Sequence, residues 1–203
     1  GATLTNLTSN GQVAVQNGQT GYLEGTITNN AVLQLNSSGT LTDLRINGDI
    51  TLTGPGSLTM GNSDRNRILN GSSVGTLTNA AGHTIQGAGQ LGVNLIGLDN
   101  QGLILANQSA GMVINLRDAV DVSRVNTGIL RADGGTLTIL STDLANASGG
   151  AAGLIEAVNG SKVVLSGSTI TGGTLNTASG GIIELQGATL TNLTSNGQVA
   201  VQN

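Results

Sequence analysis

The sequence predicts an all-β chain folded as a single-chain parallel β-helix, or β-solenoid, of about eight or nine irregular coils. Three observations predict it. Short runs alternate apolar and polar residues, Asn-Gly pairs separate many of these runs, and residues 187–203 repeat residues 1–17 letter for letter. We therefore expect one continuous segment over 1–203, in which 1–186 is a full repeat and 187–203 starts the next. We expect a right-handed coil, the usual hand of such folds.

The period-two runs are the strand signal. They stand at Thr3–Leu7, Gln12–Val15, Val32–Leu35, Ile50–Leu52, Ser57–Met60, Leu103–Ala106, Thr136–Ile139 and Ile182–Leu185. No stretch shows a helical period of 3.6 residues. The chain is therefore predicted to form short strands throughout.

The connections between these strands are predicted at Asn-Gly pairs, because both residues tolerate the positive φ of tight turns. Such pairs stand at 10–11, 17–18, 47–48, 70–71 and 159–160. A recurring phrase of Gly or Asn followed by β-forming residues predicts coils of about 20 to 23 residues. One gap in this phrase suggests a further turn within Ser57–Leu69. At about 4.8 Å per coil the rod would be roughly 40 Å long.

The composition fits a narrow aliphatic core. Hydrophobic residues make up 37% of the chain and the net charge is only −4, unlike a disordered segment. Tyr22 is the only aromatic residue and cysteine is absent, so neither large aromatic side chains nor disulfides support the core. A β-sandwich is the main rival fold, but short strands, missing aromatics and a repeat joined without a linker favour the solenoid.

Two stretches, Thr76–Gly92 and Leu98–Asn107, carry a resemblance to a known group of proteins. Their pattern of short β-forming runs and turn residues, which extends along the chain, resembles the β-helical repeat regions of giant bacterial surface and secreted adhesin-like proteins. These regions are similar to filamentous haemagglutinin and to autotransporter passengers. The resemblance implies a non-catalytic, stiff stalk or spacer, located outside the cell or on the bacterial cell surface. It transfers no functional residues.

The charge balance restricts the expected partners. The chain has 7 basic and 11 acidic residues. Proteins that bind nucleic acids or anionic membranes usually do so through clustered Lys and Arg. No apolar run approaches the roughly 20 residues that span a bilayer. We expect no nucleic acid and no membrane insertion, and an export signal outside this sequence. The expected partners are neighbouring repeats stacked end to end, and a host or environmental surface reached through other domains.

Candidate catalytic and metal-binding residues are few. Asp118 and Asp121 lie in Arg117–Arg124 and could converge only in a loop, where we expect a solvated turn rather than the carboxylate pair of a polysaccharide-acting enzyme. His83 is the single histidine, which excludes a multi-histidine metal site within the chain. We expect no Ser/His/Asp set, and we expect His83 on a surface turn. The calcium-binding nonapeptide is absent, and Ala132–Gly135 is too short to replace it. We therefore expect no enzyme, metal or cofactor.

Two polar features remain. Asp64–Arg67 is the densest charged patch, and we expect a protruding loop with Asp–Arg pairing of little energetic consequence. Thr-x-Thr triplets suggest an alternative, an ice- or surface-binding solenoid. Their uneven spacing predicts no regular ladder, because a ladder needs one triplet per coil, and Thr is also a common strand residue. The triplets begin at Thr3, Thr26, Thr40, Thr51, Thr76, Thr136 and Thr169.

Overall fold

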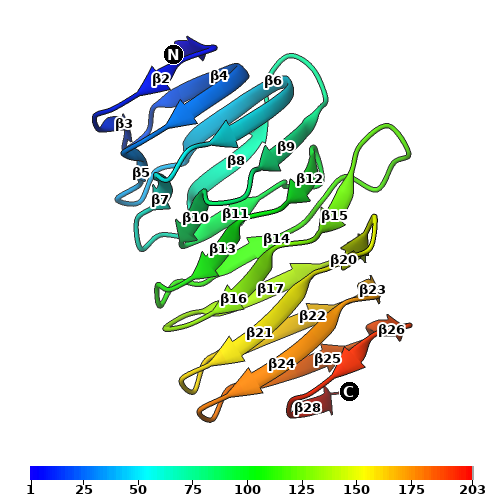
Figure 1. Cartoon of the computed structure of the whole chain (residues 1–203). Coiled ribbons are helices and arrows are strands. Elements are labelled where there is room, and N and C mark those ends of the chain that lie inside the picture. Colours follow the sequence, from blue (N-terminus) through cyan, green and yellow to red (C-terminus); the bar gives the residue numbers. More distant parts are fainter. Residues whose placement is uncertain (203) are drawn as a thin grey trace.

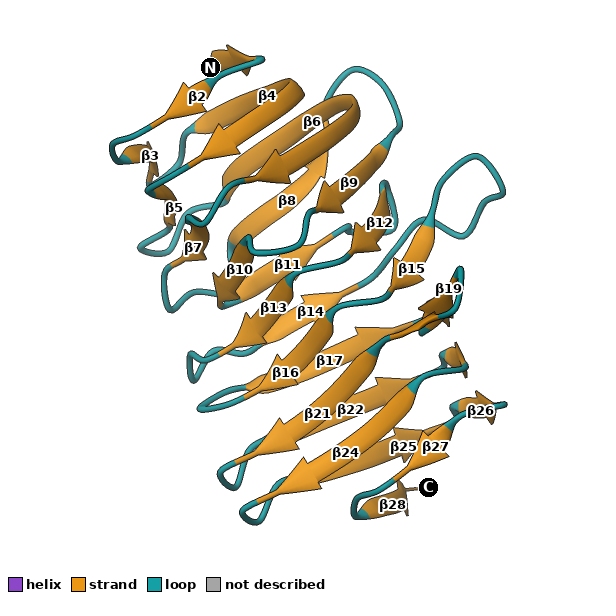
Figure 2. Cartoon of the chain, viewed as in Figure 1, coloured by secondary structure: helices purple, strands orange, loops and turns teal. Residues whose placement is uncertain are grey.

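The protein is an all-β solenoid of about eight turns, as described by a computed structural model covering residues 1–202. Its strands stack in sequence order from the N-terminal to the C-terminal end (Figure 1). Strands and the connections between them account for the whole described range (Figure 2). Within residues 1–202 no helix has the length and apolar character needed to cross a membrane. The predicted fold class is confirmed.

Each turn contributes one strand to each of three faces, which we number in chain order. Face 1 contains β1 (Ala2–Thr5), the first part of β4 (Thr20–Asn29), the first part of β6 (Thr42–Thr53), β8 (Asn66–Asn70), β11 (Gly89–Leu91), β14 (Met112–Ile114), β17 (Thr136–Leu140), β22 (Lys162–Ser166), β25 (Ile182–Gln186) and β28 (Val199–Gln202). Face 2 contains β2 (Thr8–Ser9), the second parts of β4 and β6, β9 (Thr76–Asn79), β12 (Gly97–Asn100), β15 (Arg124–Asn126), β18 (Asp143–Ala145), β23 (Thr169–Thr171) and β26 (Thr189–Thr191).

Face 3 is a separate nine-stranded sheet. It contains β3 (Val13–Gln16), β5 (Val32–Asn36), β7 (Ser57–Met60), β10 (Thr84–Gly87), β13 (Leu103–Ala106), β16 (Ile129–Ala132), β21 (Leu154–Val158), β24 (Thr174–Ala178) and β27 (Thr194–Ser195). A small antiparallel pair, β19 (Ala147–Ser148) and β20 (Ala151–Ala152), lies in the connection between β18 and β21.

The stacked strands pair in parallel, and the pairing sets the coil length. Faces 1 and 2 form one 17-stranded sheet because β4 and β6 pass around the corner between them without a break. The offset between paired residues ranges from 16, between Leu185 and Val201, to 27, between Ser57 and Thr84. The predicted coil of about 20 to 23 residues was therefore too uniform, because connections of different lengths join strands that stack in register.

The core is a set of stacked aliphatic columns, as the composition predicts. Alternate residues of each strand point inward, so one buried side chain lies directly on its counterpart in the next coil. On face 3 the fully buried column runs through Ile85, Ile104, Leu130, Ile155 and Leu175. Each such side chain contributes about 1.5–3 kcal/mol relative to an exposed one.

One predicted turn lies inside a strand, and another is present within narrower limits than predicted. Asn47-Gly48 lies inside β6, where Gly48 takes a φ of 77° at the corner between face 1 and face 2. The turn expected within Ser57–Leu69 is limited to residues 61–65, because Ser57–Met60 is β7 and Asn66–Asn70 is β8. The error at Asn47-Gly48 has a physical cause, because a glycine at a corner can bend a strand without ending it.

Candidate functional site

The first and last coils have the same sequence but occupy different faces. Residues 1–17 form β1 on face 1, β2 on face 2 and β3 on face 3. Residues 187–202, which repeat them, form β26 on face 2, β27 on face 3 and β28 on face 1. Asn203, the last residue of the second copy, lies outside the described residues. One unit of 186 residues therefore contains eight complete turns and one additional strand, β25 on face 1.

The two copies share the same local conformation. Asn6 and Asn192, which are equivalent residues, both adopt the left-handed region, with φ of 48° and 51°. Leu4 pairs with Leu23 on face 1, whereas the equivalent Leu190 pairs with Ile170 on face 2. Each leucine thus meets an inward aliphatic side chain. A segment of period two fits either face because all three faces present the same alternation to the core.

The last coil packs on its predecessor as a full member of the solenoid. Thr189 donates its backbone N–H to Ser168 O at 2.8 Å, and Thr194 donates to Gly173 O at 2.9 Å. On face 1, Val199 and Val201 pair with Ile183 and Leu185. The seam between one unit and the start of the next therefore has continuous parallel pairing and no linker.

The first coil leaves the core open at the N-terminal end. A hollow of about 250 Å³ lies there, and its apolar walls include Leu4, Val13, Val15, Leu33 and Leu35. At the opposite end Val201 is 76% exposed. Both ends of the described chain thus present apolar surface and strand edges of the kind that pair with further strands.

A hydrogen-bonded ladder of six side chains, five asparagines and one histidine, runs along the interior of the solenoid. Asn79 Nδ2 donates to Asn100 Oδ1 at 2.7 Å, Asn100 Nδ2 donates to Asn126 Oδ1 at 2.7 Å, and Asn126 Nδ2 donates to Asn146 Oδ1 at 2.6 Å. Toward the N-terminal end the ladder continues from Asn79 through His83 to Asn29. All six residues are fully buried. Because each amide donates in the same direction along the rod, the bonds polarise one another.

His83 belongs to this ladder, which corrects its predicted place on a surface turn. Its imidazole lies between Asn29 and Asn79, whose strands β4 and β9 are separated by β6. Its Nδ1 lies 2.8 Å from Asn79 Oδ1 and its Nε2 lies 3.1 Å from Asn29 Nδ2. This geometry assigns the proton to Nδ1, which donates, while Nε2 accepts. Burial lowers the pKa of His83 from 6.5 to about 4, so the ring is neutral at physiological pH.

The sequence contains a signal for the ladder that the turn assignment overlooked. Asn100-Gln-Gly102 and Asn126-Thr-Gly128 place a buried amide two residues before a glycine. A Cβ at Gly102 would lie 2.3 Å from His83 O, and one at Gly128 would lie 2.1 Å from Gly102 O. The glycines are therefore required where successive coils approach at the ladder corner. A repeated Asn-x-Gly after a strand indicates such a corner.

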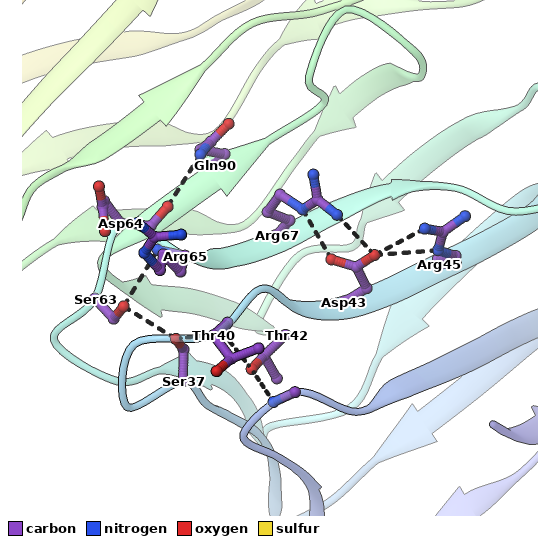
Figure 3. A network of polar contacts seen from close by, with 11 residues as sticks. Ser37, Thr40, Thr42, Asp43, Arg45, Ser63, Asp64, Arg65, Arg67 and Gln90 are labelled. Carbon is purple, nitrogen blue, oxygen red and sulfur yellow. Dashed lines mark hydrogen bonds and ion pairs between the residues drawn. The ribbon is translucent and has the colours of Figure 1, made fainter.

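Asp43 is the centre of a charged cluster on face 1 that sequence reasoning missed (Figure 3). Arg67 Nε donates to Asp43 Oδ1 at 2.8 Å, and Arg67 Nη2 and Arg45 Nη2 donate to Oδ2 at 2.9 and 2.8 Å. The carboxylate is almost completely buried. Burial by itself raises the pKa of Asp43, but the hydrogen bonds and charges of Arg67 and Arg45 outweigh it, and the net pKa is lowered.

The expected loop at Asp64–Arg67 is only half correct. Asp64 and Arg65 are exposed residues of a connection, whereas Asn66 and Arg67 belong to β8. Arg67 binds Asp43 of the preceding coil rather than Asp64. Asn66 is fully buried, and its Nδ2 donates to Gly61 O at 2.9 Å. The local sequence around Arg67 did not reveal this pairing, because the partner, Asp43, lies 24 residues away in sequence.

Asp118 and Asp121 lie in a connection between β14 and β15 that projects from the stack (Figure 1). Asp118 Oδ1 lies 3.1 Å from Arg124 Nη1, and Asp121 Oδ1 lies 3.2 Å from Arg117 Nε. Each carboxylate is bound by its own arginine. Val120 between them is fully exposed. Among residues 1–202 no group of three or more His, Cys, Asp or Glu residues is placed to hold a metal ion.

Threonine pairs stack over part of face 2, although their sequence spacing is uneven. Thr26 and Thr28 lie directly on Thr51 and Thr53, and Thr51 lies on Thr78. The stack ends where Thr78 meets Asp99. The prediction of no ladder was therefore wrong over these coils. The triplets at Thr26 and Thr51 are 25 residues apart, which is the offset between the paired strands there, and the triplet at Thr40 lies outside the stack.

The chain thus has three notable features: two end coils of equivalent sequence, an interior ladder and a projecting loop. Comparison of the chain with protein-family models, with curated proteins and with solved structures gave no match.

Proposed function

We propose that the chain is a non-catalytic structural repeat module of a giant bacterial surface or secreted adhesin-like protein, where it acts as a stiff stalk. One observation carries the proposal. Residues 187–202, which start a second unit, continue the coil with the same parallel pairing as the first. A unit that adds itself in this way lengthens a rod without a linker or a new fold.

Stiffness follows from the direction of the stabilising contacts. The inter-strand hydrogen bonds run along the rod, and bending it would strain the ladders of all three faces together. The interior adds a second set of axial bonds, from Asn79 to Asn146. Charged pairs such as Asp43–Arg67 and Arg131–Glu156 also connect successive coils. Cross-links of this kind resist sliding of one coil over the next.

In this role the stalk projects other domains away from the cell. Adhesion to a host or environmental surface would belong to those domains. The outward faces of the rod are rich in small polar side chains and contain a single aromatic residue, Tyr22, so they offer little to stack on sugar rings. The proposed location is the bacterial cell surface or the extracellular medium.

A test of the stalk is to display chains of one, two and four units on a bacterial surface, each with the same fluorescent tag at its outer end. Height measurement by fluorescence interference should show a constant increment per added unit. A matched control carries a flexible Gly/Ser segment of equal residue number, for which the height rises only with the square root of length. Tag heights that follow the flexible control would overturn the proposal.

The stacked threonines of face 2 favour a second candidate, a solenoid that binds ice or another flat surface. Thr26, Thr28, Thr51 and Thr53 form two adjacent rows at the spacing of successive coils. Thermal hysteresis of the purified chain distinguishes the two functions. A stalk gives none, whereas an ice binder gives a hysteresis that Thr26→Tyr or Thr51→Tyr abolishes.

A further inference from the structure

We propose that consecutive units join with a rotation of one face, so that the array returns to its starting orientation only after three units. The proposal rests on the proposed function, because it describes how the units of the stalk meet. Its basis is the placement of one sequence on two sets of faces. Residues 1–17 start on face 1, and their copy at 187–202 starts on face 2.

The contacts at the seam identify the partner of the open first coil. Leu4, Val13 and Val15 line the hollow at the N-terminal end. Their equivalents in the second copy, Leu190, Val199 and Val201, pair with Ile170, Ile183 and Leu185. The occupant of the hollow is therefore the coil formed by residues 169–186 of the preceding unit. The structure contains this interface once, at its C-terminal end.

The second coil of a second unit can follow the same rotation, because the residue that holds its corner is already in place. In the first unit, Asn6 Oδ1 accepts the backbone N–H of Thr26 at 3.0 Å. This bond holds the corner where β4 passes from face 1 to face 2, and Gly25 is required there because a Cβ would lie 2.1 Å from Asn6 Oδ1. Asn192 has the same backbone conformation as Asn6. It can hold the equivalent corner of the second unit between face 2 and face 3.

The rotation determines how the rod displays its projecting loop. In the described unit, residues 115–123 connect β14 on face 1 to β15 on face 2. In the second unit the same loop would stand between faces 2 and 3, and in the third between faces 3 and 1. The exposed Val120 and its flanking ion pairs would thus face three directions in turn. No side of the stalk carries this loop in every unit.

The placement of the second copy is tested first in the 203-residue chain, which has no cysteine. Thr171 and Thr191 are paired neighbours on face 2, and adjacent strands lie within the Cα separation that a disulfide allows. The double variant Thr171→Cys, Thr191→Cys should form an intramolecular disulfide on mild oxidation. The control Thr171→Cys, Ala200→Cys should not, since Ala200 pairs with Glu184 on face 1. The reverse result would overturn the placement.

The rotation between units is tested in a four-unit chain carrying Val120→Cys, labelled with gold, in selected units. Electron cryotomography should show the labels of units one and two on different sides of the rod, and those of units one and four on the same side. Labels of units one and two on one side would overturn the rotation. If Val120→Cys prevents folding, Ser72→Cys in the exposed connection between β8 and β9 gives the same readout. A rod that lengthens with labels on one side contradicts only the rotation, whereas a chain that fails to lengthen contradicts the stalk itself.

Discussion

Asn100 donates a hydrogen bond of 2.7 Å from its Nδ2 to the Oδ1 of Asn126 in the next coil, and both side chains are fully buried. Asn100→Ala leaves Asn126 Oδ1 without this donor inside the core. We expect the free energy of unfolding to fall by about 2 to 4 kcal/mol, since buried unpaired polar atoms are costly. Urea unfolding measures the loss.

The matched control is Asn30→Ala. Asn30 Nδ2 donates to Asn10 Oδ1 at the same 2.7 Å, but this pair is exposed to solvent. Water replaces the lost bond there, so the change should stay within about 0.5 kcal/mol. Equal losses in the two variants would contradict a stabilising role for the buried ladder.

Stability should depend on pH through His83. Its folded pKa of about 4 lies below the unfolded value of 6.5, so the unfolded chain binds the proton first as pH falls. The free energy of unfolding should therefore be constant above pH 6.5, and should decline between pH 6.5 and 4 by up to about 3 kcal/mol. Urea unfolding across this range measures the decline. His83→Gln, which cannot titrate, should remove the slope between pH 6.5 and about 5, above the range in which carboxylates titrate. A slope that survives the substitution in this range would contradict the assignment.

Asp43→Asn tests the charged cluster on face 1. The substitution removes the negative charge that binds Arg45 and Arg67, and we expect a loss of about 1 to 3 kcal/mol. Asp121→Asn, which affects the exposed pair with Arg117, should cost less than about 1 kcal/mol. Thermal unfolding at low and high salt separates the two, because exposed pairs are screened more strongly. An equal salt response would argue against a buried cluster.

The open end of the first coil should promote association between molecules. Leu4 lines the apolar hollow at that end, so Leu4→Lys places a charge where a second chain would pack. Light scattering should show mass rising with concentration for the natural chain, and a smaller rise for Leu4→Lys. Thr3→Lys on the same strand is the control, because Thr3 is exposed and points away from the core. A monomer at every concentration for the natural chain would show that the end does not associate.

Much of the fold could be predicted from the alternation of residues. Ser57–Met60 and Leu103–Ala106 were predicted as strands and are β7 and β13 with the same limits. The period-two signal is local, since it depends only on which side chains share one face of a strand. Which face of the solenoid a strand joins depends instead on connection length. The sequence for this reason did not reveal that Gly11 precedes a strand of face 3 and the equivalent Gly197 one of face 1.

The interior polar residues could not be predicted by the same reasoning. Asn is as suitable for a turn as for a buried ladder, and only the stacking of equivalent residues decides between them. His83 illustrates the difficulty, because its buried partner Asn29 lies 54 residues away in sequence. Asp43 was missed because its partner Arg67 becomes adjacent only through coil pairing.

The central claim, that units continue one another as a single rod, is tested most directly by small-angle X-ray scattering. The maximum dimension of a two-unit chain is compared with that of the 203-residue chain. The claim predicts an increase of about 40 Å, the height of one unit at about 4.8 Å per coil. An increase far below this value would mean that the copies fold back or pack side by side, and would contradict the continuous rod.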